Sequence, residues 1–474
     1  MPDFRGPSRS AACCHDASSA AISEPRRSHP AGPVPLTPSH PRRRIGSLVQ
    51  RAKSSVLARN LAAVTSSAAV AQAIVFAFSP LITRIYGPEA FGAQGVFLSL
   101  ISIFTPIIAL RYPMAIVIVR RDREALYLAR LSLRIALTLA GAMLLILFLF
   151  RDPISVALGA DILGNLIYFL PLALFCVALQ DVASFQAARQ NQFSLVSRVT
   201  IIQAFLINSA RVLGGLLMPV AATLVAITTI APSVLALQLW HKIRGNLPRA
   251  PRLDRRRIST LLRRHREFPL YQVPTDVLNA ASQSAPVILL AALFSPAAAG
   301  LYALTRSVFN LPLNIITMAM SNVLYARFAE LARERRPIAP LFIKMTLLLL
   351  LPAPAIIGVA YWAPAIFSFM FGSEWREAGH YAQWMSIWIV FGIANLPAIR
   401  IAPIIQGQHR LFVANILILI ARVSAILAGY FYYNDARTVV ILFSLVSALS
   451  NIAIILDFIL PTRKFDRVNC EKRS

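Results

Sequence analysis

The stretch LYALTRSVFNLPLNIITMAM, residues 301–320, is long and apolar enough to cross a lipid bilayer, yet it carries a cation, Arg306, near its start. A spanning helix needs about 20 apolar residues, because each residue advances the helix by about 1.5 Å and the hydrocarbon layer is about 30 Å thick. The chain as a whole is 57% hydrophobic and 14% charged, with a mean hydropathy of +0.64. This composition excludes a set of water-soluble domains and predicts an all-α integral membrane protein.

Similar apolar runs recur along the chain between polar breaks. They predict about twelve transmembrane helices, near residues 61–83, 91–110, 131–150, 166–187, 197–216, 220–240, 270–294, 300–323, 341–363, 380–399, 411–432 and 438–460.

Basic residues predict the orientation of these helices, because Lys and Arg resist translocation across the membrane. Of the 47 Lys and Arg residues, 39 fall in the tails and in the loops on one side, and only 4 fall on the other side. We therefore expect a multi-pass membrane protein with both termini in the cytoplasm. The net charge of +27 then reflects topology, so membrane lipids are the expected partners of these loops and nucleic acid is not.

Residues 1–60 are rich in Ser, Pro, Ala and Arg and contain no long apolar run, which predicts a disordered, basic cytoplasmic tail. An organellar transit peptide and a start codon assigned too early are the alternatives. The four cysteines have neither zinc nor redox spacing.

Two segments with similar sequences suggest an internal repeat. YGPEAFGAQ, residues 86–94, follows the first predicted helix, and FSPAAAGLY, residues 294–302, follows the seventh. An even number of helices in each copy predicts two six-helix bundles related by a pseudo-twofold axis along the membrane normal. The predicted bundles span residues 61–240 and 269–460, with a basic cytoplasmic linker at 241–268 and a cytoplasmic tail at 461–474.

Four arginines lie inside predicted helices, where a cation costs about 2.5 to 3.5 kcal/mol unless it has a partner or a wet cavity. Arg306 lies near the outer end of its helix, so it either snorkels to the headgroups or serves function. Arg134 is expected to snorkel at the cytoplasmic face. Arg211 and Arg422 are deeper and occupy corresponding helices of the two halves.

Polar residues follow one helix, at 270–294, along most of its length. Asp276 lies about two turns into it and should not reach Arg306, and Asn279, Ser282 and Gln283 continue the polar stripe. The stripe predicts either hydrogen bonds between helices or one wall of a hydrophilic cavity.

Common sequence motifs for catalysis, nucleotide binding and metal binding are absent from the sequence. The sequence contains no P-loop, no His or Cys cluster and no GxSxG motif, so we expect no catalytic residues, no metal site and no cofactor. Loops on the predicted outer side are short, which leaves no room for an external catalytic domain.

Several motifs together resemble those of the polysaccharide biosynthesis and oligosaccharide flippase family, within the multidrug, oligosaccharidyl-lipid and polysaccharide exporter superfamily. They include PLITRIYGPEAFG, LRYPMAIVIVRRDREAL, ARQNQFSLVSR and FGSEWREAGHYAQW, in this order along the chain. The resemblance covers residues 59 to about 460. It implies a V-shaped pair of bundles around a central cavity. It also implies a transporter of the bacterial cytoplasmic (inner) membrane and not an enzyme.

The resemblance also implies a substrate, a polyprenyl-diphosphate-linked oligosaccharide that is flipped across the membrane by alternating access for O-antigen, capsule or exopolysaccharide synthesis. Arginine binds phosphate bidentately, so the cavity cations are candidates to contact the diphosphate. The candidate cations are Arg306, Arg211, Arg422, Arg84 and Arg111. Asp276 is the candidate for ion coupling, and Asn279, Ser282 and Gln283 are the candidate polar wall.

Two other functions stay open. A drug/cation antiporter of the same superfamily predicts a cavity dominated by carboxylates, and a membrane polymerase or ligase of the same glycan pathway predicts a large outer loop. We expect a monomer, with a polymerase and a chain-length regulator of the pathway as possible protein partners.

Overall fold

The computed structural model describes residues 56–150, 153, 161–243 and 255–471. The predicted tail at 1–60 falls almost wholly outside this part of the chain, as does much of the predicted linker. Every regular element in the described part is a helix.

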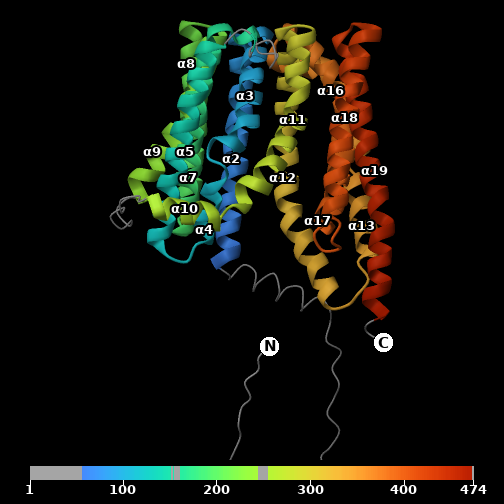
Figure 1. Ribbon diagram of the computed structural model, residues 1–474. Helices are drawn as coiled ribbons and strands as arrows, with labels where there is room; N and C mark the ends of the chain where they lie inside the picture. Colours follow the sequence, from blue (N-terminus) through green and yellow to red (C-terminus); the bar gives the residue numbers. More distant parts are fainter. Residues whose placement is uncertain (1–55, 151–152, 154–160, 244–254, 472–474) are drawn as a thin grey trace, which may run out of the picture. The chain divides into compact units, whose positions relative to one another are not determined.

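The first half of the chain forms a group of long helices with two shorter ones between them (Figure 1). They are α2 (Val56–Ile85), α3 (Pro88–Ile108), α4 (Tyr112–Ile118), α5 (Asp122–Leu149), η1 (Asp161–Tyr168), α7 (Phe169–Arg189), α8 (Phe193–Leu217) and α9 (Ala221–Ile243).

The second half follows a short amphipathic helix, α10 (Arg255–Arg264), within the predicted linker. Its elements are η3 (Phe268–Gln272), α11 (Val273–Leu293), α12 (Pro296–Arg333), α13 (Ala339–Leu350), α14 (Ala353–Tyr361), α15 (Ala363–Phe371), η4 (Ser373–Trp375), α16 (Arg376–Ala394), α17 (Leu396–Ile401), α18 (Gln408–Tyr433) and α19 (Ala436–Glu471).

Eleven segments of the described residues are long and apolar enough to cross a membrane. The eighth predicted helix, at 300–323, lies within α12, some of whose side chains fall outside the described residues. With 38 residues, α12 is about 57 Å long, far longer than the hydrocarbon layer requires. Together, the eleven apolar helical segments make this a multi-pass membrane protein.

Two predicted helices are interrupted. The run at 341–363 is divided between α13 and α14, because Pro352 and Pro354 cannot donate the backbone hydrogen bonds that a continuous helix needs. The run at 380–399 begins in α16 and ends in α17.

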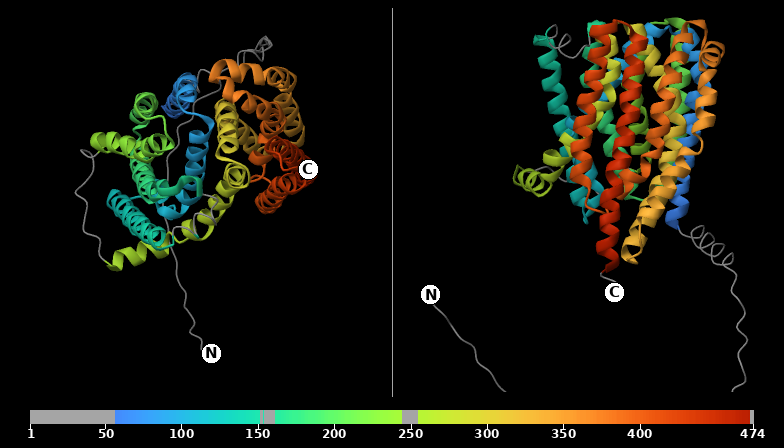
Figure 2. Two further views of the ribbon diagram at one scale, coloured as in Figure 1. Left: turned by 90° about the horizontal axis from the view of Figure 1, so that it is seen from above. Right: turned by 90° about the vertical axis from the view of Figure 1, so that its right-hand side faces the viewer.

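The helices pack as two bundles. In the first, α2 packs on α8, and α7 packs on α5 and α9; in the second, α16 and α18 pack on α19, and α12 packs on α11 and α16. Seen from above, the blue and green helices group apart from the yellow and red ones (Figure 2). We call the end with Arg111, Arg189, Arg264 and Arg410 the basic end, and the opposite end the Gly87 end.

The two bundles meet mainly where α3 packs against α11 and α12. Near the Gly87 end, the Trp375 indole donates to the Thr83 carbonyl over 3.1 Å, and its ring lies edge-on to Phe91 with centroids 5.0 Å apart. Trp375 is almost fully buried in an apolar cluster that includes Phe367 and Phe371. These contacts join the bundles firmly at that end.

Candidate functional site

A polar cavity of about 380 Å³ opens inside the second bundle, between α11, α18 and α19. Such a concentration of amide, hydroxyl and charged groups stands out within apolar helices, where unsatisfied polar groups are costly. Its lining consists of Thr275, Asp276, Leu278, Asn279, Ser282, Gln283, Asn395, Ile399, Leu411, Phe412, Asn415, Ile418, Arg422, Asn451 and Ile454.

Helix α11 supplies the longest polar wall of this cavity. Thr275, Asn279, Ser282 and Gln283 are spaced by four, three and one residues, which places them on one face of a helix. All four line the cavity. The polar stripe predicted from the sequence therefore borders a cavity.

Arg422 lies deepest among the charged groups of the cavity. Its Nε donates to the Ser447 hydroxyl over 3.0 Å, and Nη1 lies 3.4 Å from the Ser282 hydroxyl. The guanidinium carbon stands 5.6 Å from the ring centroids of both Trp388 and Phe443, within cation–π range. No carboxylate pairs with Arg422 among the described residues, so its positive charge is available to an anion.

Asp276 occupies the part of the cavity nearer the basic end, and its partner comes from the other bundle. Arg111 Nε donates to Asp276 Oδ2 over 2.7 Å, and Gln272 donates to Oδ1 over 3.0 Å. The side chains of Arg111 and Asp276 are 24% and 22% exposed, so the pair is only partly screened by solvent. This ion pair ties the two bundles together beside the cavity.

An unusual backbone directs Arg111 toward Asp276. The chain turns sharply between α3 and α4, where Leu110 and Arg111 have φ angles of 48° and 57°. This left-handed region is unfavourable for residues with a Cβ, and such strain tends to persist at functional sites.

Arg306 borders the cavity without lining it. Its guanidinium on α12 donates to both the backbone carbonyl and the side-chain oxygen of Gln283, the latter over 2.7 Å. Gln283 itself lines the cavity, so Arg306 braces the polar wall of α11. Asp276 and Arg306 form no ion pair in the described residues.

The other two candidate cations lie away from this cavity. Arg84 is at the end of α2, where it donates to the Phe369 carbonyl over 2.9 Å near the Gly87 end. Arg211 lies on α8 in the first bundle; its Nη2 is 3.5 Å from the Thr228 hydroxyl, and its buried Nε has no hydrogen-bond partner in the described structure. The arginines therefore do not converge on one cavity, because the helices that carry them belong to different bundles or opposite ends.

Three asparagines of the cavity were not singled out from the sequence. Asn395 donates to Asn451 over 3.0 Å, and Asn415 lines the wall on α18. Asparagines inside apolar runs could have flagged these positions, because polar side chains at membrane depth need partners. Among the described residues, no group of three or more His, Cys, Asp or Glu side chains could hold a metal ion.

Comparisons with known proteins agree with this architecture. A family model described as "Polysaccharide biosynthesis protein" matches residues 81–380. The chain is also 24% identical over 329 residues to the succinoglycan biosynthesis transport protein ExoT of Rhizobium meliloti (strain 1021). That match covers 68% of this chain and 62% of the relative, so the chain spans less than two thirds of the relative's length.

Solved structures resemble the fold at low sequence identity. An inward closed conformation of the lipid II flippase MurJ has a TM-score of 0.68 at 11% identity, covering 86% of this chain and 90% of that one. An inward-facing multidrug resistance MATE family transporter of the MOP superfamily has a TM-score of 0.67 at 13% identity, covering 84% and 96%. The predicted fold class of two helical bundles is confirmed.

Proposed function

Because the chain belongs to the polysaccharide biosynthesis protein family, as its motifs predicted, we propose that it flips a polyprenyl-diphosphate-linked oligosaccharide across the bacterial inner membrane. Translocation would proceed by alternating access and would supply O-antigen, capsule or exopolysaccharide synthesis. The sequence relative ExoT is a transport protein, and the solved structures of similar fold are those of a multidrug transporter and a lipid II flippase. The membrane orientation in this proposal is the one that the basic loops predict, with the basic end in the cytoplasm.

The polar cavity of the second bundle is the observation that carries the proposal. Arg422 presents a cation without a carboxylate partner, and guanidinium groups bind phosphate oxygens bidentately. Asn279, Asn415 and Gln283 offer amide donors and acceptors that match sugar hydroxyls. A diphosphate at Arg422 with sugars along the amide wall uses both kinds of group.

Asp276 supports a role in coupling. Its carboxylate pairs with Arg111 across the two bundles, so a proton or a cation that binds Asp276 would weaken this link. Binding would then favour a state in which the bundles separate at the basic end. Arg306, by holding Gln283, keeps the polar wall in place.

A drug/cation antiporter is less well supported by this cavity. Asp276 is the one carboxylate among the described residues that line it, and Arg111 already neutralises that charge. A cationic substrate would find Arg422 as an unfavourable neighbour. We expect the protein to act as a monomer, beside the polymerase and chain-length regulator of its pathway.

Glycan export by variants tests the proposal. In a strain that lacks the chromosomal copy, Arg422→Gln should reduce surface polysaccharide at least tenfold at matched protein level, and lipid-linked precursor should accumulate on the inner leaflet. Arg422→Lys should retain partial activity, since it keeps the charge and loses the bidentate geometry. Arg327→Gln, which removes an exposed cation paired with Glu330 on α12, is the matched control and should export normally.

Two outcomes would contradict the proposal. Normal export by Arg422→Gln would show that the diphosphate does not bind in this cavity. Unpolymerised repeat units at the outer face of the deletion strain would instead indicate the polymerase or ligase function.

A further inference from the structure

A groove of about 650 Å³ runs along the outside of the second bundle, between α18 and α19. Three polar side chains, His409, Arg410 and Asp457, lie at its basic end, and Arg410 and Asp457 form an ion pair of 3.4 Å. The rest is almost entirely apolar or small. The remaining lining residues are Val413, Ala414, Leu417, Ile418, Ala421, Ser450, Ala453 and Ile454.

The groove and the polar cavity share part of their walls. Ile418 of α18 and Ile454 of α19 line both spaces. On either side of this shared wall the surroundings differ sharply: Asn415, Arg422 and Asn451 face the cavity, and apolar side chains of the same two helices face the groove. Two isoleucine side chains thus stand between a polar space and an apolar one.

Helix α18 packs more tightly near the Gly87 end than near the basic end. Its buried residues are Ala425, Ile426 and Gly429, all in the part nearer the Gly87 end. There the helices approach so closely that a Cβ on Gly429 would lie 2.7 Å from a Val439 methyl carbon. Toward the basic end, where the cavity and the groove lie side by side, α18 has no buried residue in the described structure. At that end the two helices are joined by the exposed ion pair between Arg410 and Asp457 and by the partly buried side chains of Leu411, Ala414 and Ile418. Widening the gap there breaks fewer fully buried contacts than widening it near the Gly87 end.

We propose that the gap between α18 and α19 is a lateral portal, in which the polyprenyl tail of the substrate lies in the outer groove while its diphosphate and sugars occupy the polar cavity. Ile418 and Ile454 form the seal that parts around the chain. This inference rests on the proposed function and specifies how one amphipathic molecule is bound.

The dimensions of the groove suit an extended hydrocarbon chain. From Arg410 to Ala421 the groove follows α18 for 11 residues, or about 16 Å along the membrane normal. Beyond the three polar side chains at the basic end, a tail in this position lies in largely apolar surroundings, so it does not have to enter the polar cavity with the headgroup.

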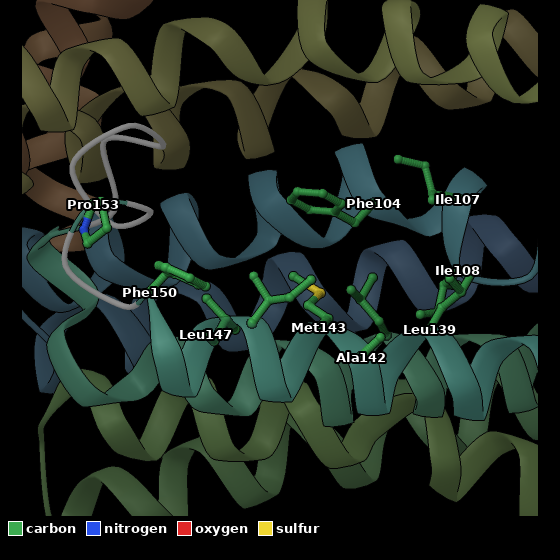
Figure 3. A pocket seen from close by; sticks show the side chains of 11 residues that line it. Phe104, Ile107, Ile108, Leu139, Ala142, Met143, Leu147, Phe150 and Pro153 are labelled. Carbon is green, nitrogen blue, oxygen red and sulfur yellow. The ribbon is translucent and has the colours of Figure 1, made fainter.

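A second apolar groove, in the first bundle, provides a control. It has a volume of about 710 Å³ and is lined by side chains of α3 and α5, among them Phe104, Leu139, Ala142 and Met143 (Figure 3). None of its lining residues borders the polar cavity. A substrate whose diphosphate and sugars occupy the polar cavity is therefore not expected to place its polyprenyl tail in this control groove.

Two probes separate head binding from tail binding in the purified protein. Inorganic diphosphate carries the head alone, and farnesyl diphosphate adds a short isoprenoid tail. Ala421→Trp fills the α18–α19 groove, and Ala142→Trp fills the control groove. We expect Ala421→Trp to weaken farnesyl diphosphate binding at least tenfold and to leave diphosphate binding unchanged, which also shows that the variant is folded. Ala142→Trp should bind both probes as the wild type does.

The alternative outcomes distinguish the two proposals. If Ala421→Trp and Val413→Trp, placed in the same groove, bind farnesyl diphosphate as tightly as the wild type, the portal is overturned and the groove holds bulk phospholipid. If the wild type binds neither probe, the proposed substrate class is overturned, and the portal falls with it.

Discussion

Gly92 of α3 and Gly300 of α12 face each other across the junction of the two bundles. A Cβ on Gly92 would lie 1.8 Å from the Pro296 carbonyl oxygen, and a Cβ on Gly300 would lie 1.9 Å from the Pro88 carbonyl oxygen. The contact is reciprocal, because each glycine meets the proline four residues before the other. The two segments of the internal repeat therefore contact each other reciprocally, as is expected of segments that meet at a pseudo-twofold axis.

Substitution of either glycine should destabilise the protein. Gly92→Ala and Gly300→Ala each place a methyl group against backbone, which cannot move aside as a flexible side chain does. We expect both variants to lower the Tm in detergent, by similar amounts because the contact is reciprocal. The cost should be at least about 1 kcal/mol, since overpacking of a tight contact typically costs about 1 to 3 kcal/mol and occasionally more.

Gly358→Ala serves as the control for this pair, because nothing lies within 4 Å of a Cβ built at that position. In a helix interior, alanine is favoured over glycine by about 0.5 to 1 kcal/mol, so this variant should be neutral or slightly more stable. A wild-type Tm for Gly92→Ala would show that the bundles do not approach as closely as described.

The Arg111–Asp276 ion pair should couple the two bundles measurably. Arg111→Gln and Asp276→Asn each leave a partner without its counter-charge, whereas the double variant removes both charges. We expect a coupling energy between about 0.5 and 3 kcal/mol in a double-mutant cycle of unfolding free energies. Strictly additive effects would mean that the pair contributes nothing to joining the bundles.

Replacing Arg211 should stabilise the protein. The buried Nε of Arg211 has no hydrogen-bond partner in the described structure, so the side chain carries an uncompensated desolvation cost. We expect Arg211→Met to raise the unfolding free energy by about 1 to 3 kcal/mol. Arg198→Met, on the exposed part of the same helix, should change it little. A lower Tm for Arg211→Met would show that the guanidinium is well solvated or paired.

Asp466 should act as a structural cap. Both of its carboxylate oxygens accept backbone hydrogen bonds at the start of α13, from Ile338 over 2.8 Å and from Ala339 over 2.7 Å. We expect Asp466→Ala to cost about 1 to 2 kcal/mol, the usual range for losing such a cap. Asp457→Ala, on the same helix, removes only an exposed pair with Arg410 and should cost less than about 1 kcal/mol. Equal losses for the two variants, measured by thermal unfolding, would contradict the capping role.

His265, just after α10, should make stability depend on pH. Burial lowers the pKa of its imidazole below the ordinary value of 6.5, and the nearby Arg264 lowers this pKa further, against the opposing charges of Glu124 and Glu267. The folded state therefore favours the neutral ring. Its contribution to stability is complete above pH 6.5 and is lost as the pH falls from there through the lower, folded-state pKa.

A comparison with His265→Gln measures this effect. Between about pH 7.5 and about pH 5.5, the Tm of the wild type should fall more than that of the variant, since only the wild type takes up a proton at this position on unfolding. Parallel pH profiles would show that His265 does not titrate differently in the two states.

Much of the fold could be read from local patterns. Apolar runs such as 301–320 predicted membrane helices, because a helix in lipid must bury its backbone polar groups within itself, whatever its neighbours are. The paired prolines and glycines at 88–92 and 296–300 predicted the repeat. The polar stripe of α11 was also visible, since helical periodicity places Asn279, Ser282 and Gln283 on one face.

The partners of the charged side chains were decided only by the tertiary structure. Depth along a helix ruled out a pair between Asp276 and Arg306, but it could not reveal that Arg111 reaches Asp276 through a left-handed turn between α3 and α4. Depth along a helix also could not reveal that Arg422 lines a cavity of the second bundle, whereas Arg211 lies in the first bundle, away from that cavity. Sequence spacing determines which face of a helix a residue occupies, whereas helix packing decides what that face meets, and packing depends on residues more than a hundred positions apart.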